Sequence, residues 1–311
     1  MSAPLAILCS GQGTQHVGMF DLVAQAPEAQ AVLETAREIL GGTDPRQFVR
    51  EVDAATLFSN RIGQILCCTQ ALAAWSMIRA HLPSTTVVAG YSVGELAAWG
   101  CAGLLEPHEV LQLASHRAEL MDEAGGSDTG LEAFVGLNQA QVEELCRPHG
   151  AHIAIVNGEN FFIVGGKKEA LQAMHDEANA GGASCATILR VAVASHTPLL
   201  AEASRRFDEA LGRLNLSKKV LSGVRLLSGV DGEVVFDVQA GSRKLAAQIS
   251  HPLHWAACLD GCRAAGASRV LEFGPGRALA RMAGHTFPEA RIRSVDDFRT
   301  PAGVVAWLGR A

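Results

Sequence analysis

A serine stands between two glycines in Gly90-Tyr91-Ser92-Val93-Gly94, which has the form G-x-S-x-G. An apolar run precedes this stretch, and the helix-like run ELAAW follows it. At a strand-to-helix turn of this kind the serine hydroxyl is exposed above a sheet, and the helix start offers N–H groups to an oxyanion. The pattern predicts a serine nucleophile, although a serine that only caps a helix fits it too. Tyr91 is the only tyrosine of the chain.

A serine hydroxyl needs a neighbouring base to become a good nucleophile. His196, in VAVASHTPLL, follows a strand-like run and precedes a Thr-Pro helix start, where loops from several elements can converge. His251 and His254, in ISHPLHW, are the alternatives. The sequence therefore offers three candidate bases, of which His196 has the most suitable surroundings.

Other chemical signals are fewer. Arg117 lies in a helical pattern and fits either an anion-binding role or an exposed ion pair with Glu119. No His, Cys and carboxylate residues have the spacing of metal ligands, so no metal is expected. The stretch FGPGRALARMAG, residues 273–284, lacks the Lys-Ser/Thr of a phosphate loop and is interpreted as a structural turn.

The elements that must position these residues follow a repeated order of strand, glycine turn and helix. Strands are expected at residues 4–10, 85–92 and 267–276, each followed by a helical pattern. This order is typical of a parallel sheet in an α/β fold. Residues 64–82 are apolar nearly all round, which predicts a buried helix.

A second pattern, β-α-β-β-α-β, occupies residues 128–191 and predicts a ferredoxin-like small domain. Its strands are expected at residues 130–137, in two runs within 152–166, and at 185–193; its helices are expected at 138–150, with Asn138 as cap, and at 167–182, closed by Gly181-Gly182. The larger domain would then comprise residues 1–127 and 192–311. After the insertion, Thr197 is expected to cap a helix that starts at Pro198.

Composition narrows the class of protein. The chain has 311 residues, 48% of them hydrophobic and 19% charged, which is enough apolar material for a large core. The net charge of −6 argues against nucleic-acid binding, and no run approaches the roughly 20 apolar residues of a membrane span. Eight cysteines without CxxC spacing, together with the lack of a signal-peptide pattern, predict free thiols in a cytoplasmic protein.

Further motifs appear in the order and spacing found in malonyl-CoA:acyl-carrier-protein transacylases: CSGQGTQ, GYSVGELAA, SHRAELM, ASHTPLL, AAQISHPLHW and LEFGPG. The chain resembles this family over essentially its whole length. The form GYSVGELAAWGCAG, with tyrosine before the serine, is most similar to the acyltransferase (epsilon) subunit of malonate decarboxylase. The resemblance implies an α/β-hydrolase-like large domain with a parallel sheet and an inserted ferredoxin-like small domain.

The resemblance also implies roles for residues of this sequence. Ser92 would be the malonylated nucleophile, His196 its base and Arg117 the partner of the malonyl carboxylate. The remaining expected roles are those of the oxyanion-hole donors Gln12 and Val93, the acyl-pocket residues Gln64 and Tyr91, and Gln248, whose main-chain carbonyl would orient the histidine. Ile65 stands where the family often has proline, so the match at Gln64 is looser.

The implied reaction is ping-pong transfer of malonyl from malonyl-CoA to the thiol of an acyl carrier protein, with no permanently bound cofactor. The acceptor expected from the closer resemblance is the CoA-like prosthetic group of the malonate decarboxylase carrier. The alternative is a phosphopantetheine thiol in fatty-acid or polyketide synthesis; a serine hydrolase and a docking subunit with a relic site are the other classes. An acidic carrier would meet a basic patch, for which the candidates are Arg190, Arg205, Arg206, Lys218 and Lys219.

Overall fold

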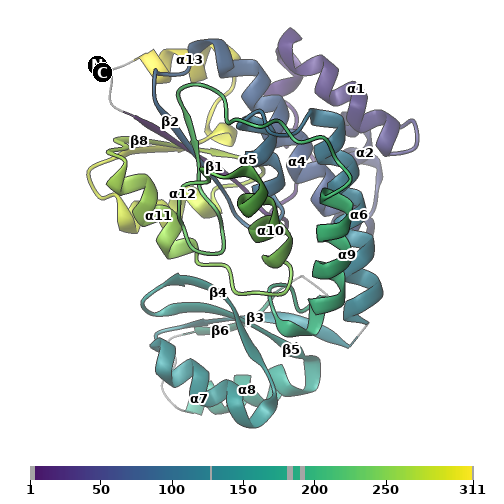
Figure 1. The fold of residues 1–311 in the computed structure, drawn as a ribbon, viewed down its shortest axis with the longest axis vertical. Coiled ribbons are helices and arrows are strands. Elements are labelled where there is room, and N and C mark those ends of the chain that lie inside the picture. The colour runs from purple at the N-terminus through teal and green to yellow at the C-terminus, as the bar shows by residue number, and fades with distance from the viewer. Residues whose placement is uncertain (1–3, 127, 181–184, 190–192, 310–311) are drawn as a thin grey trace.

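The computed structural model describes residues 4–126, 128–180, 185–189 and 193–309. These residues form a larger unit around a five-stranded sheet and a smaller unit with a four-stranded sheet of its own (Figure 1). This is an α/β fold with a small inserted unit, as the sequence predicts.

The five strands of the central sheet are all parallel and lie in the order β7-β2-β1-β8-β9. Their bounds are β1 (Leu5–Cys9), β2 (Thr86–Gly90), β7 (Val224–Leu226), β8 (Arg269–Phe273) and β9 (Arg291–Ser294). Every residue of β1, β2 and β8 is buried, as expected for parallel strands covered on both faces. The three strands predicted from the sequence are confirmed, each somewhat shorter than expected.

Two layers of helices cover this sheet. Leu5, Ile7 and Cys9 of β1 face one core, whereas Ala6 and Leu8 face the other, because successive strand side chains alternate. The helices of the first layer and its flank are α1 (Gln30–Ile39), α2 (Pro45–Glu51), α3 (Ala54–Leu57), α4 (Asn60–Ile78), α5 (Gly94–Cys101), α6 (Pro107–Gly125), α9 (Ala201–Leu211), α10 (Val238–Ala247) and α13 (Pro301–Gly309). The second layer contains α11 (Trp255–Ala264) and α12 (Ala278–Thr286).

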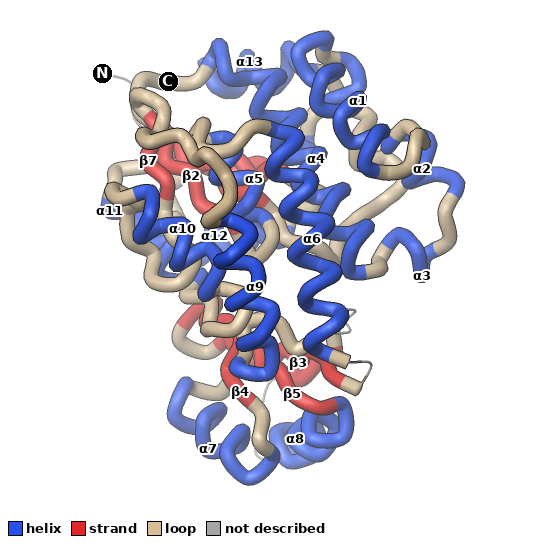
Figure 2. Tube along the Cα trace, turned by 45° about the vertical axis from the view of Figure 1, so that its right-hand side comes forward, coloured by secondary structure: helices blue, strands red, loops and turns tan. Residues whose placement is uncertain are grey.

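Helix α4 is the centre of the first layer and carries buried residues on every side, which confirms the buried helix predicted there. It begins at Asn60, four residues earlier than predicted, and ends at Ile78 before a 3-10 turn. Helices α4, α6 and α9 lie side by side in Figure 2. In this layer α6, which carries Arg117, lies next to the first turns of α4.

The smaller unit contains β3 (Thr129–Val135), α7 (Gln139–His149), β4 (His152–Gly158), β5 (Phe161–Lys167), α8 (Lys168–Ala180) and β6 (Cys185–Ile188). Its strands pair antiparallel in the order β4-β5-β3-β6, which is the ferredoxin-like order. Helices α7 and α8 cover the sheet face that points away from the larger unit (Figure 1). The other face packs on the larger unit, where Leu131, Ile155 and Ile163 share a core with Leu253 and Trp255.

Local predictions near this unit have mixed outcomes. Asn138 caps α7 as expected, since its side chain accepts from the Gln141 N–H at 3.0 Å. Thr197 does not cap a helix: its hydroxyl donates to the Ala194 carbonyl at 2.7 Å, and α9 begins only at Ala201 after a 3-10 turn. The predicted boundaries at 127/128 and 191/192, the closing glycines 181–182 and Arg190 lie on or beside residues outside the described part.

Within the described ranges, no helix is both long and apolar enough to cross a bilayer. The cysteine side chains that the structure describes are buried free thiols: Cys9, Cys67, Cys68, Cys101, Cys146, Cys258 and Cys262. The free-thiol prediction is therefore confirmed for these residues.

Candidate active site

Ser92 lies on the sharp turn between β2 and α5, with a left-handed φ of 56°. The glycines on either side are required by close backbone contacts. A Cβ at Gly90 would lie 2.2 Å from the Glu95 nitrogen, and a Cβ at Gly94 would lie 2.1 Å from the Cys9 carbonyl oxygen. The G-x-S-x-G spacing therefore allows β2 to turn directly into α5 across the end of β1, with the serine at its apex.

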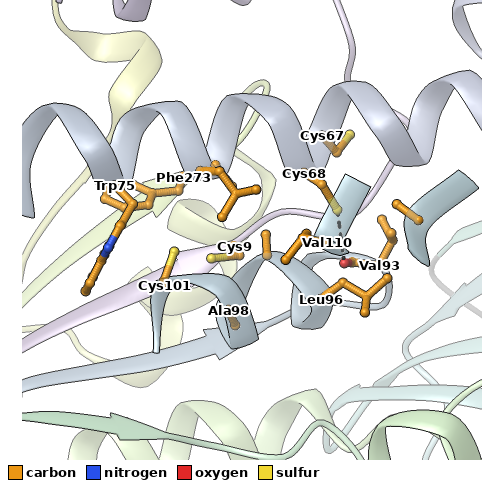
Figure 3. Close-up of a cluster of buried hydrophobic side chains, with 14 of the residues drawn as sticks. Cys9, Cys67, Cys68, Trp75, Val93, Leu96, Ala98, Cys101, Val110 and Phe273 are labelled. Carbon is orange, nitrogen blue, oxygen red and sulfur yellow. Dashed lines mark hydrogen bonds between the residues drawn. The ribbon is translucent and has the colours of Figure 1, made fainter. Parts of the chain in front are cut away.

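Helix α4 contacts the turn that leads into α5. Figure 3 shows Cys68 of α4 pointing at this turn, where its thiol donates to the Val93 carbonyl at 3.6 Å. Gly11 packs on the same turn, because a Cβ there would lie 2.9 Å from the Tyr91 carbonyl and 3.6 Å from Ser92 Cβ. The N–H groups of Gln12 and Val93 have no hydrogen-bond acceptor among the described residues. Both remain available to a ligand beside Ser92.

His196 is the histidine that the structure places against Ser92. Its Nε2 lies 2.9 Å from Ser92 Oγ, and its Nδ1 lies 2.5 Å from the main-chain carbonyl oxygen of Gln248. A carbonyl oxygen can only accept a hydrogen bond, so Nδ1 carries the proton, and Nε2 is the unprotonated nitrogen that accepts a hydrogen bond from the Ser92 hydroxyl. Burial, and then the positive charge of Arg117, lower the pKa of His196 to about 3. The imidazole is thus neutral and can act as a base.

The two alternative bases lie elsewhere. His251 is exposed, and its Nδ1 lies 3.0 Å from the carbonyl oxygen of Ala247, the last residue of α10. His254 lines a different cleft, between α7 and the loop before α11. Neither side chain lines the cleft that contains Ser92.

Arg117 extends from α6 and is 2% exposed. Its guanidinium donates to Gln64 Oε1 at 2.8 Å and to Gln248 Oε1 at 3.1 Å. No carboxylate of the described residues lies within 4.0 Å of it, and Glu119 pairs instead with Arg61 at 3.2 Å. The surface ion pair considered for Arg117 is therefore wrong. Burial lowers the pKa of Arg117 to about 10. It is a buried cation whose hydrogen-bond acceptors, in the part of the chain that the structure describes, are all neutral oxygens.

These groups share one cleft between the two units. It is lined by Gly11, Gln12, Asn60, Gln64, Tyr91, Ser92, Arg117, Met121, Leu131, Ile155, Leu189, Ser195 and His196. Tyr91 packs edge-on against Trp255, with ring centroids 5.3 Å apart. Burial raises the Tyr91 pKa, and the neighbouring Asn157 of β4 opposes that shift. The cleft thus contains a serine–histidine pair, a buried cation and apolar walls.

Two groups were not anticipated from the sequence. Glu95, directly after the Ser92 turn, is fully buried and hydrogen bonded to the Gln248 side chain. Only the main-chain carbonyl of Gln248 was expected to contribute to the site, whereas its side chain also contacts Arg117 and Glu95. The one feature of the sequence that could have indicated a role for Glu95 is its position as the charged residue in the otherwise apolar run ELAAW.

Two further observations bear on partners and metals. Of the candidates for a basic patch, Arg205 forms ion pairs with Glu202 and Glu209, and Arg206 with Glu123. These arginines are therefore largely neutralised by their own neighbours. Across the described ranges, no group of three or more His, Cys, Asp or Glu side chains is arranged to hold a metal ion.

Comparison with known proteins assigns the chain to a family. A family model described as the acyl transferase domain matches residues 7–225. The malonyl CoA-acyl carrier protein transacylase of Salmonella typhimurium is 28% identical over 284 residues, which cover 88% of this chain and 90% of that protein. Polyketide biosynthesis protein ThaF of Burkholderia thailandensis is 27% identical over 97% of this chain, which spans 26% of that longer protein.

Solved structures agree with these sequence matches. The acyl-carrier-protein S-malonyltransferase of Burkholderia pseudomallei superposes with a TM-score of 0.89 at 26% identity, and the match covers 99% of this chain and 100% of that one. These comparisons do not show the closer likeness to the malonate decarboxylase subunit. Because the family model covers more than half of the residues, the chain belongs to the acyl transferase family.

Proposed function

We propose that this chain is a malonyl-CoA:acyl-carrier-protein acyltransferase that works through a malonyl ester on Ser92. The observation that carries the proposal is Arg117, a buried guanidinium that lies in the same cleft as the Ser92–His196 pair and has no carboxylate partner among the described residues. An unpaired buried cation is costly, so the cleft favours an acyl group that brings a carboxylate. Malonyl has such a group, and acetyl does not.

In the first half-reaction, Ser92 Oγ attacks the thioester carbonyl carbon of malonyl-CoA while its proton moves to His196 Nε2. The N–H groups of Gln12 and Val93 would stabilise the oxyanion of the tetrahedral intermediate. When the C–S bond breaks, the CoA sulfur leaves as the thiol with the proton from His196. Ser92 then carries the malonyl ester. Because Nδ1 donates to the Gln248 carbonyl, the imidazolium formed in this step is oriented by main chain rather than by a carboxylate.

In the second half-reaction, His196 takes the proton of an incoming thiol, and the thiolate attacks the ester carbonyl. Collapse of this intermediate transfers the malonyl group to sulfur and returns the proton to Ser92 Oγ. The burial of Ser92's neighbours limits the access of water, which would otherwise hydrolyse the ester. The same residues therefore serve both half-reactions of the ping-pong cycle.

The favoured acceptor is the phosphopantetheine thiol of an acyl carrier protein. The names of the Salmonella relative and of the Burkholderia pseudomallei neighbour support it, since both refer to acyl-carrier-protein malonyl transfer. The carrier of malonate decarboxylase, with its CoA-derived prosthetic group, is the second candidate and rests on Tyr91 in the motif GYSVGELAAWGCAG. Tyr91 lines the cleft beside Ser92, where it could contact the acceptor.

A brief exposure to malonyl-CoA followed by intact-protein mass spectrometry tests the proposal. We expect a malonyl adduct that maps to Ser92 and is absent in Ser92→Ala. Rapid release of free malonate without a carrier would instead identify a hydrolase, and a protein that stays unmodified would leave only a docking role.

The acceptor is tested by offering the two carriers side by side, each with its own prosthetic group, to the preformed malonyl-enzyme. We expect faster loss of the adduct to the phosphopantetheine carrier. Faster transfer to the malonate decarboxylase carrier would reverse the order of the two acceptors while leaving malonyl transfer itself in place.

A further inference from the structure

Glu95 is a buried carboxylate that the reaction described above does not use. It lies on the first turn of α5 and is fully buried. Its Oε2 accepts hydrogen bonds from the Gln248 Nε2 at 2.5 Å and from the Gly229 main-chain N–H at 3.1 Å. Burial raises the pKa of Glu95 to about 7, while Gln248, Gly229 and Arg117 oppose that shift. A group so costly to bury calls for a specific role.

The Gln248 side chain connects this carboxylate to the substrate-binding cation. Its Nε2 faces two acceptors, Glu95 Oε2 and the Ser92 carbonyl at 3.2 Å, and its Oε1 accepts from Arg117 at 3.1 Å. If the amide were reversed, its oxygen would face two oxygens and its NH₂ would face the guanidinium. Because a carboxylate only accepts, Glu95 sets the polarity of this amide.

When Glu95 is ionised, the arrangement gives Arg117 a nearby negative charge without blocking its binding edge. Among the described residues, the guanidinium donates hydrogen bonds only to the neutral oxygens of Gln64 and Gln248, and Glu95 lies one side chain further away. A carboxylate in direct contact with Arg117 would compete with the carboxylate of the substrate. The intervening amide leaves N–H groups of the fork unoccupied, since only one NH1 and one NH2 bond are formed.

We infer that Glu95 is a positioning residue for substrate choice: through the Gln248 amide it orients Arg117 toward the carboxylate of the acyl group. This inference rests on the proposed function. It concerns Arg117 and not the base, because His196 is held by the main chain of Gln248, whose N–H donates to the Lys244 carbonyl at the end of α10. Loss of Glu95 should therefore impair malonyl loading selectively and spare the chemistry common to all acyl groups.

The test compares the rates of Ser92 acylation by malonyl-CoA and by acetyl-CoA in wild type and in Glu95→Gln. The glutamine is isosteric, but it is neutral and can donate as well as accept hydrogen bonds. It therefore no longer fixes the orientation of the Gln248 side-chain amide. We expect the malonyl-to-acetyl ratio of kcat/KM to fall about tenfold, as for the loss of one charged hydrogen bond. The acetyl rate should change by less than about twofold.

Glu272→Gln is the matched control. Glu272 is also fully buried, and burial raises its pKa to about 7, but it binds the Ser10 hydroxyl and the N–H groups at the start of α12. It has no hydrogen bond to Gln248 or Arg117, so its substitution should leave the ratio unchanged. Equal loss of both acylation rates in Glu95→Gln, or an unchanged ratio, would overturn the inference.

A double-mutant cycle tests whether Glu95 acts through Gln248. In a Gln248→Met background, Glu95→Gln should have no further effect on the ratio, whereas additive effects would refute a shared route. If the double variant does not fold, the ratio in Glu95→Gln alone decides. Failure of wild type to form any malonyl adduct would refute the proposed function instead, so the two failures are distinguishable.

Discussion

Replacement of Arg117 by methionine should remove most of the preference for malonyl-CoA over acetyl-CoA. Burial lowers the pKa of this guanidinium from its ordinary value of 12.5 to about 10, which corresponds to a cost of about 3 kcal/mol. Because the folded protein binds this proton less tightly than the unfolded chain does, the cost is fully present at neutral pH. It is removed only as the pH rises through about 10 toward 12.5.

A malonyl carboxylate that pairs with Arg117 recovers up to this amount, whereas an acetyl group recovers none. About 3 kcal/mol corresponds to a preference of about 150-fold in kcat/KM. Methionine has no charge to recover, so most of that preference should disappear. It also leaves Gln64 Oε1 and Gln248 Oε1 without their donor, at about 1–3 kcal/mol of folding stability for each oxygen. Stability is therefore measured separately by urea unfolding.

The assay follows Ser92 acylation by each thioester in a short pulse, read by intact-protein mass. Arg61→Met serves as control, since Arg61 binds Ser115 and Glu119 on the neighbouring α6 and is 40% exposed. It should keep the wild-type ratio. An Arg117→Met protein that folds and still prefers malonyl-CoA by about a hundredfold would refute Arg117 as the carboxylate partner.

Two further predictions concern the geometry around Ser92. Gly94→Ala should lower the free energy of unfolding by at least about 2 kcal/mol and prevent acylation, because its Cβ would overlap the Cys9 carbonyl; Gly284→Ala, with nothing within 4 Å, should be neutral or slightly stabilising in the same urea titration. His196, with a pKa near 3, should support acylation at a rate that varies less than about twofold from about pH 5.5 to 8. A rate that falls with a midpoint near 6.5 would contradict that value. By linkage, the shift has no effect on stability above pH 6.5, where the imidazole is neutral in both states; stability falls as the pH drops from 6.5 toward 3, because only the unfolded chain takes up the proton there.

Features whose cause is local in the chain could be predicted from the sequence. The strands around β1, β2 and β8 follow from short apolar runs, and the turn at Ser92 from the spacing of its two glycines. The insertion has its own core and its own strand order, so its β-α-β-β-α-β pattern is readable without the rest of the chain.

Features that depend on tertiary burial were missed. Glu95 and Gln248 are 153 residues apart, and nothing in either segment indicates that a buried carboxylate meets an amide. Threonine is a residue type common at helix caps, but the Thr197 hydroxyl donates to the Ala194 carbonyl three residues earlier. A threonine hydroxyl can bond to any of several nearby main-chain groups, and the sequence does not show which one. Arg117 beside Glu119 looks like a surface pair until α6 is packed on α4, which turns the arginine inward.

The backbone conformation distinguishes His196 from the other two candidate bases, His251 and His254. Among the described residues, only Ser92 and His196 are non-glycine residues with left-handed φ values, 56° and 62°. Such a conformation costs about 1–2 kcal/mol for a residue with a Cβ, and glycine would avoid that cost at either position. Glycine, however, would supply neither the hydroxyl nor the imidazole. The fold therefore retains strain at the two positions whose side chains meet at 2.9 Å, and this coincidence supports their joint role independently of any motif.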